Sequence, residues 1–406
     1  MLRTLFNAVR EKDIRKKLGW TFLILFIYRI GTHITVPGVN PSAMANMANS
    51  GLMNILNIFS GGGLMNYSLF AMGVSPYVTA QIVVQLLQLD IVPRFVEWSK
   101  QGEVGRRKLN NATRWLTLVL AFVQSVGITA GFNSLSAYGL VSQTNNVMSF
   151  IVIGSVMTIG TFFAMWLGEM ITEKGLGNGV SMIIFAGIIA QAPEGLYEIF
   201  KENILQANSN DLTNGIVFMA VLITAMILII GITTWFYEAT RRLQMQYTRS
   251  AVSYGSEAYL PLKVNVSGVI PVIFASSFIS TPQTILFAFQ DKFASAQWYQ
   301  VMQQIFSMTT LPGAILYTVL IIVFTYFYAF VQVNPEKLAE NLQKQGAYIV
   351  GVRPGDETKA FVSQLLLSLS FVGSIFLGFV ALVPLIASDV WSLNEKIGLG
   401  GTSLLI

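Results

Sequence analysis

The sequence lacks cysteine altogether and has a single histidine among its 406 residues. Without cysteine the chain can form no disulfide, no thiolate nucleophile and no Cys-ligated metal site. His33 has no carboxylate close to it in the sequence, and one imidazole cannot complete a metal site alone. We therefore expect no metal and no other cofactor, and we interpret His33 as an ordinary interfacial residue rather than a ligand or a proton relay.

Charge is also scarce, because Asp, Glu, Lys and Arg make up 11% of the residues and apolar residues make up 53%. An average soluble domain has about 25% charged residues, so lipid must be much of the solvent around this chain. The sequence contains no phosphate-binding loop, no HExxH zinc motif and no GxSxG nucleophile elbow. These absences argue against an enzyme.

Long apolar runs are present instead. We predict ten membrane spans, because ten runs approach the roughly 20 residues that a bilayer core requires. They are residues 19–37, 75–91, 115–134, 147–171, 179–197, 214–236, 266–288, 313–332, 361–385 and 395–406. The last run is short and stops at Ile406, so we expect the sequence to be truncated within its final helix.

The positions of Lys and Arg orient these spans. Only Lys201, Lys292 and Lys396 fall on one side and Arg29 falls inside a span, which leaves 21 of the 25 basic residues on the other side. An excess of Lys and Arg marks cytosolic loops, so the N-terminus is predicted to be cytosolic. Residues 1–18 are basic and amphipathic without a cleavage site, which favours a helix on the inner leaflet, next to anionic lipids, over a signal peptide.

Residues 40–74 are apolar, yet they cannot cross the membrane. The N-terminal tail and the loop 92–114 are both basic, so an even number of crossings separates them, and the first two runs already supply it. The region contains three consecutive glycines at 61–63. It is either a short re-entrant helix with a glycine hinge or an outer surface loop with an interfacial helix, and the spacing favours neither.

Breaks in the spans suggest an internal repeat. Pro76 begins the second span, and Pro271 and Pro282 are expected to kink the seventh. Breaks at matching places are typical of inverted repeats, here spans 1–5 and 6–10. Secondary transport of small solutes is one hypothesis for such a repeat, but it usually needs a charge near the membrane midplane, where this sequence has almost none. A scaffold without a pore is a further alternative.

Two loops on the basic side are predicted to be structured. Polar and apolar residues alternate at 243–247, which indicates a hairpin within 238–265. Asn334, Pro335 and Gly346 are start and stop signals for a helix over 334–346. A rigid turn that presents Arg353 follows.

Motifs along essentially the whole chain resemble those of the SecY family. They are FSGG (59–62), SPYVTA (75–80) with Gln85, GE (168–169), KGLGNG (174–179), RR (241–242), LPLKVN (260–265), GVIP (268–271), RPG (353–355) and GGTS (400–403). The resemblance implies an all-α polytopic membrane protein with ten transmembrane helices in two inverted pseudo-symmetric halves and a re-entrant plug helix. Its parts would be a cytosolic amphipathic segment (1–18), an N-terminal half (19–197) with the plug at about 54–67, and a C-terminal half (198–406) with cytosolic loops 238–265 and 333–360.

The resemblance also implies four sites. The pore ring would be Val78, Ile82, Val180, Ile184, Ile270, Ile273 and Ile406. The plug would include Ile55, Ile58, Phe59, Gly61, Gly62, Gly63 and Leu64. The lateral gate, between the second and seventh spans, would carry Thr79, Gln85 and Asn265, and docking of a motor or ribosome would use Arg241, Arg242, Arg249 and Arg353. An apolar ring can yield to a passing chain while offering ions no substitute for their hydration.

The implied function is a protein-conducting channel of the bacterial cytoplasmic membrane. It would translocate unfolded secretory polypeptides and release transmembrane segments laterally into lipid. Because the chain has no nucleotide motif, the SecA motor ATPase or the ribosome would supply the energy. Other implied partners are the SecE and SecG subunits, secretory preproteins with their signal sequences, and a membrane insertase. The sequence departs from the family in one ring valine and in a hairpin tip with only Arg249 between Arg242 and Lys263, which weakens the tip's expected share in ribosome contact.

Overall fold

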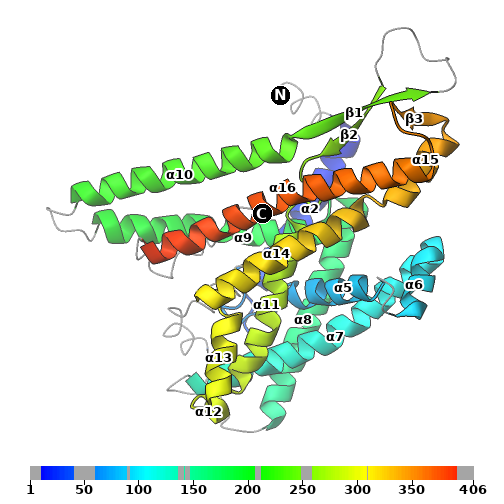
Figure 1. Ribbon diagram of the computed structural model, residues 1–406. Helices are drawn as coiled ribbons and strands as arrows, with labels where there is room; N and C mark the ends of the chain where they lie inside the picture. The colour runs from blue at the N-terminus through cyan, green and yellow to red at the C-terminus, as the bar shows by residue number, and fades with distance from the viewer. Residues whose placement is uncertain are drawn as a thin grey trace.

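The computed structural model describes residues 11–40, 60–88, 92–135, 141, 147–205, 212–247, 258–308 and 310–390. Helices dominate this part of the chain (Figure 1). Seven of these helices are long and apolar enough to cross a membrane. They are α7 (Gly102–Leu135), α8 (Val147–Lys174), α9 (Gly179–Phe200), α10 (Leu212–Glu238), α11 (Ile270–Ala288), α14 (Leu311–Gln332) and α16 (Asp356–Val390).

Two further helices, α2 (Lys12–Gly31) and α5 (Ser75–Leu87), coincide with the first two predicted spans. Helix α2 runs without interruption through residue 18, where the interfacial segment is expected to meet the first span, and that boundary stays a prediction. Pro271 lies in the first turn of α11, where its ring fits, so the kink expected at that residue is also wrong. The tenth predicted span, 395–406, lies outside the described residues.

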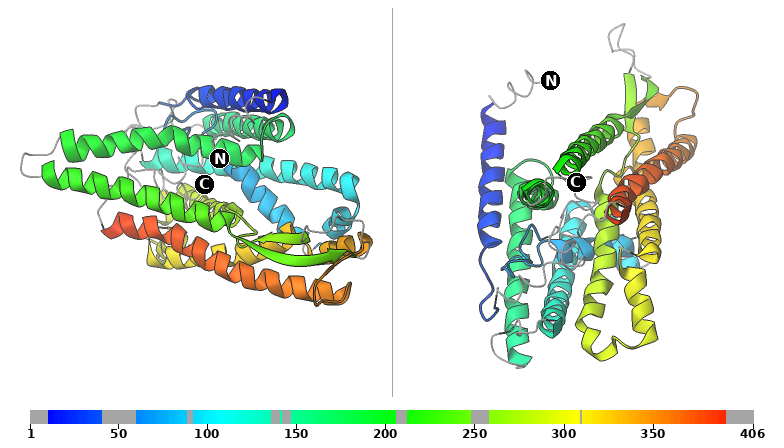
Figure 2. Two further views of the ribbon diagram at one scale, coloured as in Figure 1. Left: turned by 90° about the horizontal axis from the view of Figure 1, so that it is seen from above. Right: turned by 90° about the vertical axis from the view of Figure 1, so that its left-hand side faces the viewer.

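The long helices pack in two groups. In the first, α7 packs against α5 and α8, and α8 packs in turn against α2 and α9; Figure 2 shows α2 at one edge of the molecule. In the second, α14 packs between α11 and α16. The groups meet where α11 packs against α5 and α7. The first group holds the predicted spans 1–5 and the second holds spans 7–9, whereas α10, the predicted span 6, packs against η1. The division into halves and the inverted symmetry between them stay predictions.

The segment 60–74 contains turns instead of a regular element, and most of it is buried. Its backbone bonds to the chain that follows α2: the N–H of Val36 donates to the carbonyl of Tyr67 at 3.0 Å, and the N–H of Leu69 donates to that of Ile34 at 2.9 Å. Irregular backbone at membrane depth is tolerated only inside protein or beside water. This burial favours the re-entrant interpretation over a surface loop. The helical part predicted before residue 60 lies outside the described residues.

A small sheet lies at one end of the molecule (Figure 1). Strands β1 (Thr240–Tyr247) and β2 (Ala258–Lys263) pair antiparallel with Leu243 opposite Leu260, which confirms the predicted hairpin. Strand β3 (Ala347–Ile349), which the sequence did not predict, pairs with the other edge of β1. Helix α15 (Pro335–Lys344) confirms the helix predicted over 334–346, and the side chain of Asn334 accepts hydrogen bonds from two N–H groups of its first turn.

Short elements complete the fold. They are α6 (Pro93–Lys100), the π-helix η1 (Lys201–Leu205), α12 (Gln290–Phe293) and α13 (Gln297–Phe306). Large apolar side chains point outward along the long helices; on α10, Ile227 is 66% exposed and Trp235 is 75% exposed. An apolar exterior of this extent is suited to lipid and not to water.

Candidate pore, lateral gate and docking face

Six of the seven predicted ring residues lie in one apolar cluster at the centre of the fold. Val78 and Ile82 from α5, Ile184 from α9 and Ile273 from α11 are buried within it. Val180 and Ile270 are partly buried and pack against the same cluster. The seventh, Ile406, lies outside the described residues. The cluster is large and also takes residues from α2, α8, α14 and α16, so it places the six residues in one continuous apolar core.

Glycine and proline breaks bring α5, α9 and α11 together. Gly179 starts α9 against α8 so closely that an added Cβ would overlap the backbone carbonyl of Gly168. Helix α5 starts with Ser75-Pro76, and α11 follows Gly268, whose φ of 65° suits glycine. Each helix thus presents its first two turns to the cluster. This is why the ring residues follow directly after breaks in the sequence.

The predicted plug residues divide at residue 60. Ile55, Ile58 and Phe59 lie outside the described residues. The glycines at 61 and 62 have φ of 63° and 87°. A Cβ at Gly61 would lie 3.0 Å from the Cα of Gly187 in α9, and a Cβ at Gly63 would lie 2.8 Å from the carbonyl oxygen of Phe70. Leu64 is completely buried, so this glycine run is fixed in a space that side chains at those positions could not share.

A polar contact crosses the interface of α5, α7 and α11. The hydroxyl oxygens of Thr79 and Thr281 are 3.4 Å apart, and Nε2 of Gln124 donates to Oγ1 of Thr281 at 2.9 Å. Thr79 was predicted at this gate, but Gln124 and Thr281 were missed. For Thr281 the available signal was its place four residues after Ser277, in an otherwise apolar span.

Gln85 and Asn265 do not form one shared polar contact at the gate. Oδ1 of Asn265 accepts from the Ser267 hydroxyl at 3.0 Å and from the Gly268 N–H at 3.1 Å, so it caps the turn before α11. Oε1 of Gln85 is buried without a hydrogen-bond partner among the described residues. The predicted polar positions therefore serve different local structures.

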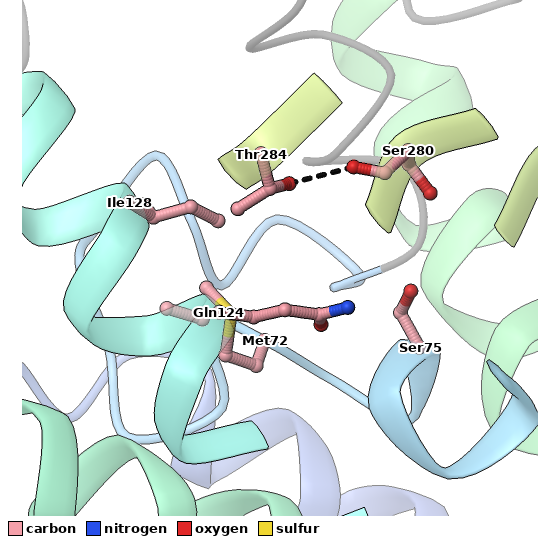
Figure 3. A pocket seen from close by; sticks show the side chains of 7 residues that line it. Met72, Ser75, Gln124, Ile128, Ser280 and Thr284 are labelled. Atoms are coloured by element: carbon pink, nitrogen blue, oxygen red, sulfur yellow. Dashed lines mark hydrogen bonds between the residues drawn. The ribbon is translucent and has the colours of Figure 1, made fainter. Parts of the chain in front are cut away.

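A small polar cavity lies beside the Thr79–Thr281–Gln124 contact (Figure 3). Its lining comes from the re-entrant segment, α5, α7 and α11, and consists of Ala71, Met72, Ser75, Gln124, Ile128, Ser280 and Thr284. The volume of about 10 Å³ is at the lower limit for one water molecule. The interface between the two packing groups is therefore not completely filled at this point.

Two of the predicted docking arginines are exposed on β1 and carry no ion pair among the described residues. Arg241 and Arg242 are both exposed, and the guanidinium of Arg242 lies over the ring of Tyr259 at 4.9 Å. The side chain of Arg353 is 86% exposed and pairs with Glu357 at 3.7 Å. Arg249 lies outside the described residues. The sheet, α15 and the start of α16 share an apolar core that holds this basic surface together.

The described residues hold no cluster of His, Asp and Glu that could bind a metal ion. Among the described residues, one ion pair joins two of the long helices, Arg114 of α7 with Glu169 of α8 at 2.7 Å, and it is partly exposed. The arrangement is suited to an apolar seal and a basic docking surface. Among the described residues, no set of side chains is arranged for acid–base or nucleophilic chemistry.

Comparison with known sequences is consistent with these features. A sequence model of the SecY family matches residues 68–406. The chain is 60% identical over its whole length to protein translocase subunit SecY 1 of Lactobacillus kefiranofaciens, covering 94% of that protein. It is 46% identical to protein translocase subunit SecY of Staphylococcus aureus, covering 100% of this chain and 94% of that one.

Solved structures share the fold. A structure described as that of a protein conducting channel has a TM-score of 0.64 at 19% identity and covers 98% of this chain and 90% of its own. The canine Sec61 channel from a ribosome-channel complex has a TM-score of 0.60 at 18% identity, with the same coverage. At such identities the likeness concerns the arrangement of the helices.

Proposed function

The chain belongs to the SecY family, and from that premise we propose how its parts conduct a polypeptide. It is a multi-pass membrane protein and a subunit of a protein translocase, with the function of a protein-conducting channel. The observation that carries the detailed proposal is that Val78, Ile184 and Ile273, from three helices and both packing groups, are buried in the same apolar cluster.

The proposed constriction is the ring of Val78, Ile82, Val180, Ile184, Ile270, Ile273 and Ile406. Its described members are aliphatic and carry no donor or acceptor on their side chains, so a hydrated ion meets no substitute for its water shell. A polypeptide in extended form can displace such side chains, because none of them is held by a hydrogen bond. The buried glycine run at 61–63 and Leu64 would seal the same pathway as part of the plug.

The proposed lateral gate is the interface of α11 with α5 and α7. Its contacts include the short polar set of Thr79, Thr281 and Gln124, and a small cavity lies beside them. A signal sequence entering there would replace helix–helix contacts by its own apolar contacts and open a route to lipid. Gln85 and Asn265 would border this route.

The proposed docking face is the sheet with the turn at Arg353. Its exposed arginines, Arg241 and Arg242 together with Arg353, offer donors for acidic groups of the ribosome or of the SecA motor. In this proposal SecE and SecG are the companion subunits, an insertase is a further partner, and the protein lies in the bacterial cytoplasmic membrane with a cytosolic N-terminus. The basic tail would contact anionic lipids of the inner leaflet.

Reconstitution into proteoliposomes tests this function. With the companion subunits, the motor, ATP and a secretory precursor, we expect the precursor to become protected from added protease. Uptake of a small solute driven by an ion gradient, with no protected precursor, would instead support a secondary transporter and contradict the proposal.

A further inference from the structure

Arg29 is a cation within the first span, and its guanidinium is hydrogen-bonded to a backbone carbonyl. Nη1 of Arg29 donates to the carbonyl oxygen of Gly61 at 2.8 Å. The described residues contain four ion pairs, and none of them includes Arg29. An ionisable residue inside a membrane span is costly and is usually retained for a function. For Arg29, the hydrogen bond to the carbonyl of Gly61 indicates where that function lies.

The residue before Arg29 binds the same segment. The hydroxyl of Tyr28 donates to the carbonyl oxygen of Ser60 at 3.2 Å, and its ring stacks on Phe70 with centroids 5.0 Å apart. Two consecutive residues of α2 therefore donate to two consecutive carbonyls of the irregular segment. Tyr28 is 3% exposed, so this contact lies inside the protein.

On the opposite side, α9 closes the space. The backbone of Gly61 approaches Gly187 so closely that an added Cβ would lie 3.0 Å from its Cα. A Cβ at Gly62 would lie 3.5 Å from Nη1 of Arg29 and 3.8 Å from Nε2 of Gln191. The glycine run is thus held between α2 and α9, and the guanidinium of Arg29 is a charged hydrogen-bond donor to it.

We propose that Arg29 is the positioning residue that keeps residues 60–62 in the sealed arrangement. The inference deepens the proposed function and rests on it, because it concerns the seal of that channel. If the run moved away, the partly buried guanidinium would lose this acceptor, which makes displacement unfavourable until the channel is engaged. A neutral side chain at position 29 would remove this resistance to displacement of the run.

The absence of cysteine allows a direct test. Leu64→Cys places a thiol at a completely buried position of the segment, and its rate of labelling by a membrane-permeant maleimide reports exposure. The rate is measured in the assembled complex with Arg29, with Arg29→Met, with Arg29→Lys and with Tyr28→Phe. Ile171→Cys, equally buried but on α8, is the matched control for general loosening.

We expect Arg29→Met to raise the labelling rate of Leu64→Cys by about ten- to a hundredfold, since a hydrogen bond to a charged group is lost. Arg29→Lys should restore most of the protection, and Tyr28→Phe, which keeps the ring, should raise the rate by about two- to tenfold. Ile171→Cys should not change.

An unchanged rate in Arg29→Met would overturn the proposal, and so would an equal rise at Ile171→Cys. If Arg29→Met does not assemble, an unchanged rate in Tyr28→Phe would overturn it. Resting ion conductance of the same complexes separates the two levels of inference. Increased labelling without increased conductance would support the role of Arg29 in holding the segment and contradict the sealing function.

Discussion

Gly160 of α8 shows at the scale of one residue how closely the irregular segment is packed. An added Cβ there would overlap the backbone carbonyl of Leu69, and backbone cannot move aside as a flexible side chain can. Gly231 of α10 has nothing within 4 Å of the same added atom. The two glycines look alike in the sequence, yet only the first is required by a contact.

Gly160→Ala is therefore expected to destabilise the protein by about 1–3 kcal/mol, because a methyl group is forced into a filled space. Gly231→Ala is the matched control and should be neutral or stabilising by at most about 1 kcal/mol. Thermal unfolding of the purified complexes measures both. Equal midpoints for the two variants would mean that α8 and the segment do not pack as described.

The hydroxyl of Thr281 is a second residue on which a contact between helices depends. Thr281→Val keeps the shape but leaves Nε2 of Gln124 without its acceptor. We expect a loss of about 1 kcal/mol, the scale of hydrogen bonds between membrane helices, and easier opening for precursors with weakly apolar signals. Adding Gln124→Leu should recover part of the loss in a double-mutant cycle. Fully additive effects would show that the two side chains do not interact.

At the scale of elements, the docking face is a unit with its own apolar core. Leu243 of β1, Ile349 of β3 and Leu366 of α16 belong to this core. The turn with Arg353 projects from it, and its exposed side chain contributes little to packing. Charge on this turn can therefore be changed without disturbing the unit.

Arg353→Glu is expected to slow motor-driven secretion of a precursor by tenfold or more (about 1.4 kcal/mol or more of lost interaction), while the complex remains folded. The matched control is Lys344→Glu, which reverses another exposed charge of the same unit, on α15. ATP-dependent translocation and thermal unfolding are measured together. Normal transport by the Arg353 variant would remove this residue from the docking face.

Elements with a strong apolar run could be predicted from the sequence, whereas their ends and the short elements could not. Helix α7 begins at Gly102, well before the predicted span at 115, because hydropathy reports contact with lipid and polar residues can continue a helix beyond it. Strand β3 has only three residues, and its pairing with β1 depends on a chain segment about a hundred residues earlier.

The candidate site likewise contains residues that the sequence could predict and residues that it could not. The ring positions follow glycine and proline breaks that are visible in the sequence, and the motifs of the family mark them. Gln124 was not found because one amide in an apolar span has no pattern of its own, and its partner Thr281 lies 157 positions away. Arg29 was visible as a charge within a span, but only the structure shows that it binds the carbonyl of Gly61.

At the scale of the whole molecule, the packing of α11 against α5 and α7 is the most important contact, because it joins the two groups of helices. The proposed gate lies at this junction, and the proposed ring takes residues from α5 and α11 on its two sides and from α9. Ile184 and Phe185 are neighbours on α9, yet Ile184 is 2% exposed in the central cluster and Phe185 is 40% exposed on the outside. One residue therefore separates a side chain of the proposed pathway from one that faces lipid.

The most direct test of that pathway uses this pair of neighbours. A single cysteine is placed at Ile184 or, as control, at Phe185, in a chain that has none of its own, and a second cysteine is placed in a translocation-arrested precursor. We predict a disulfide with Ile184→Cys that requires both the signal sequence and the motor, and little or none with Phe185→Cys. Crosslinks at Phe185→Cys alone, or none at either position, would contradict passage of the polypeptide through the aliphatic ring.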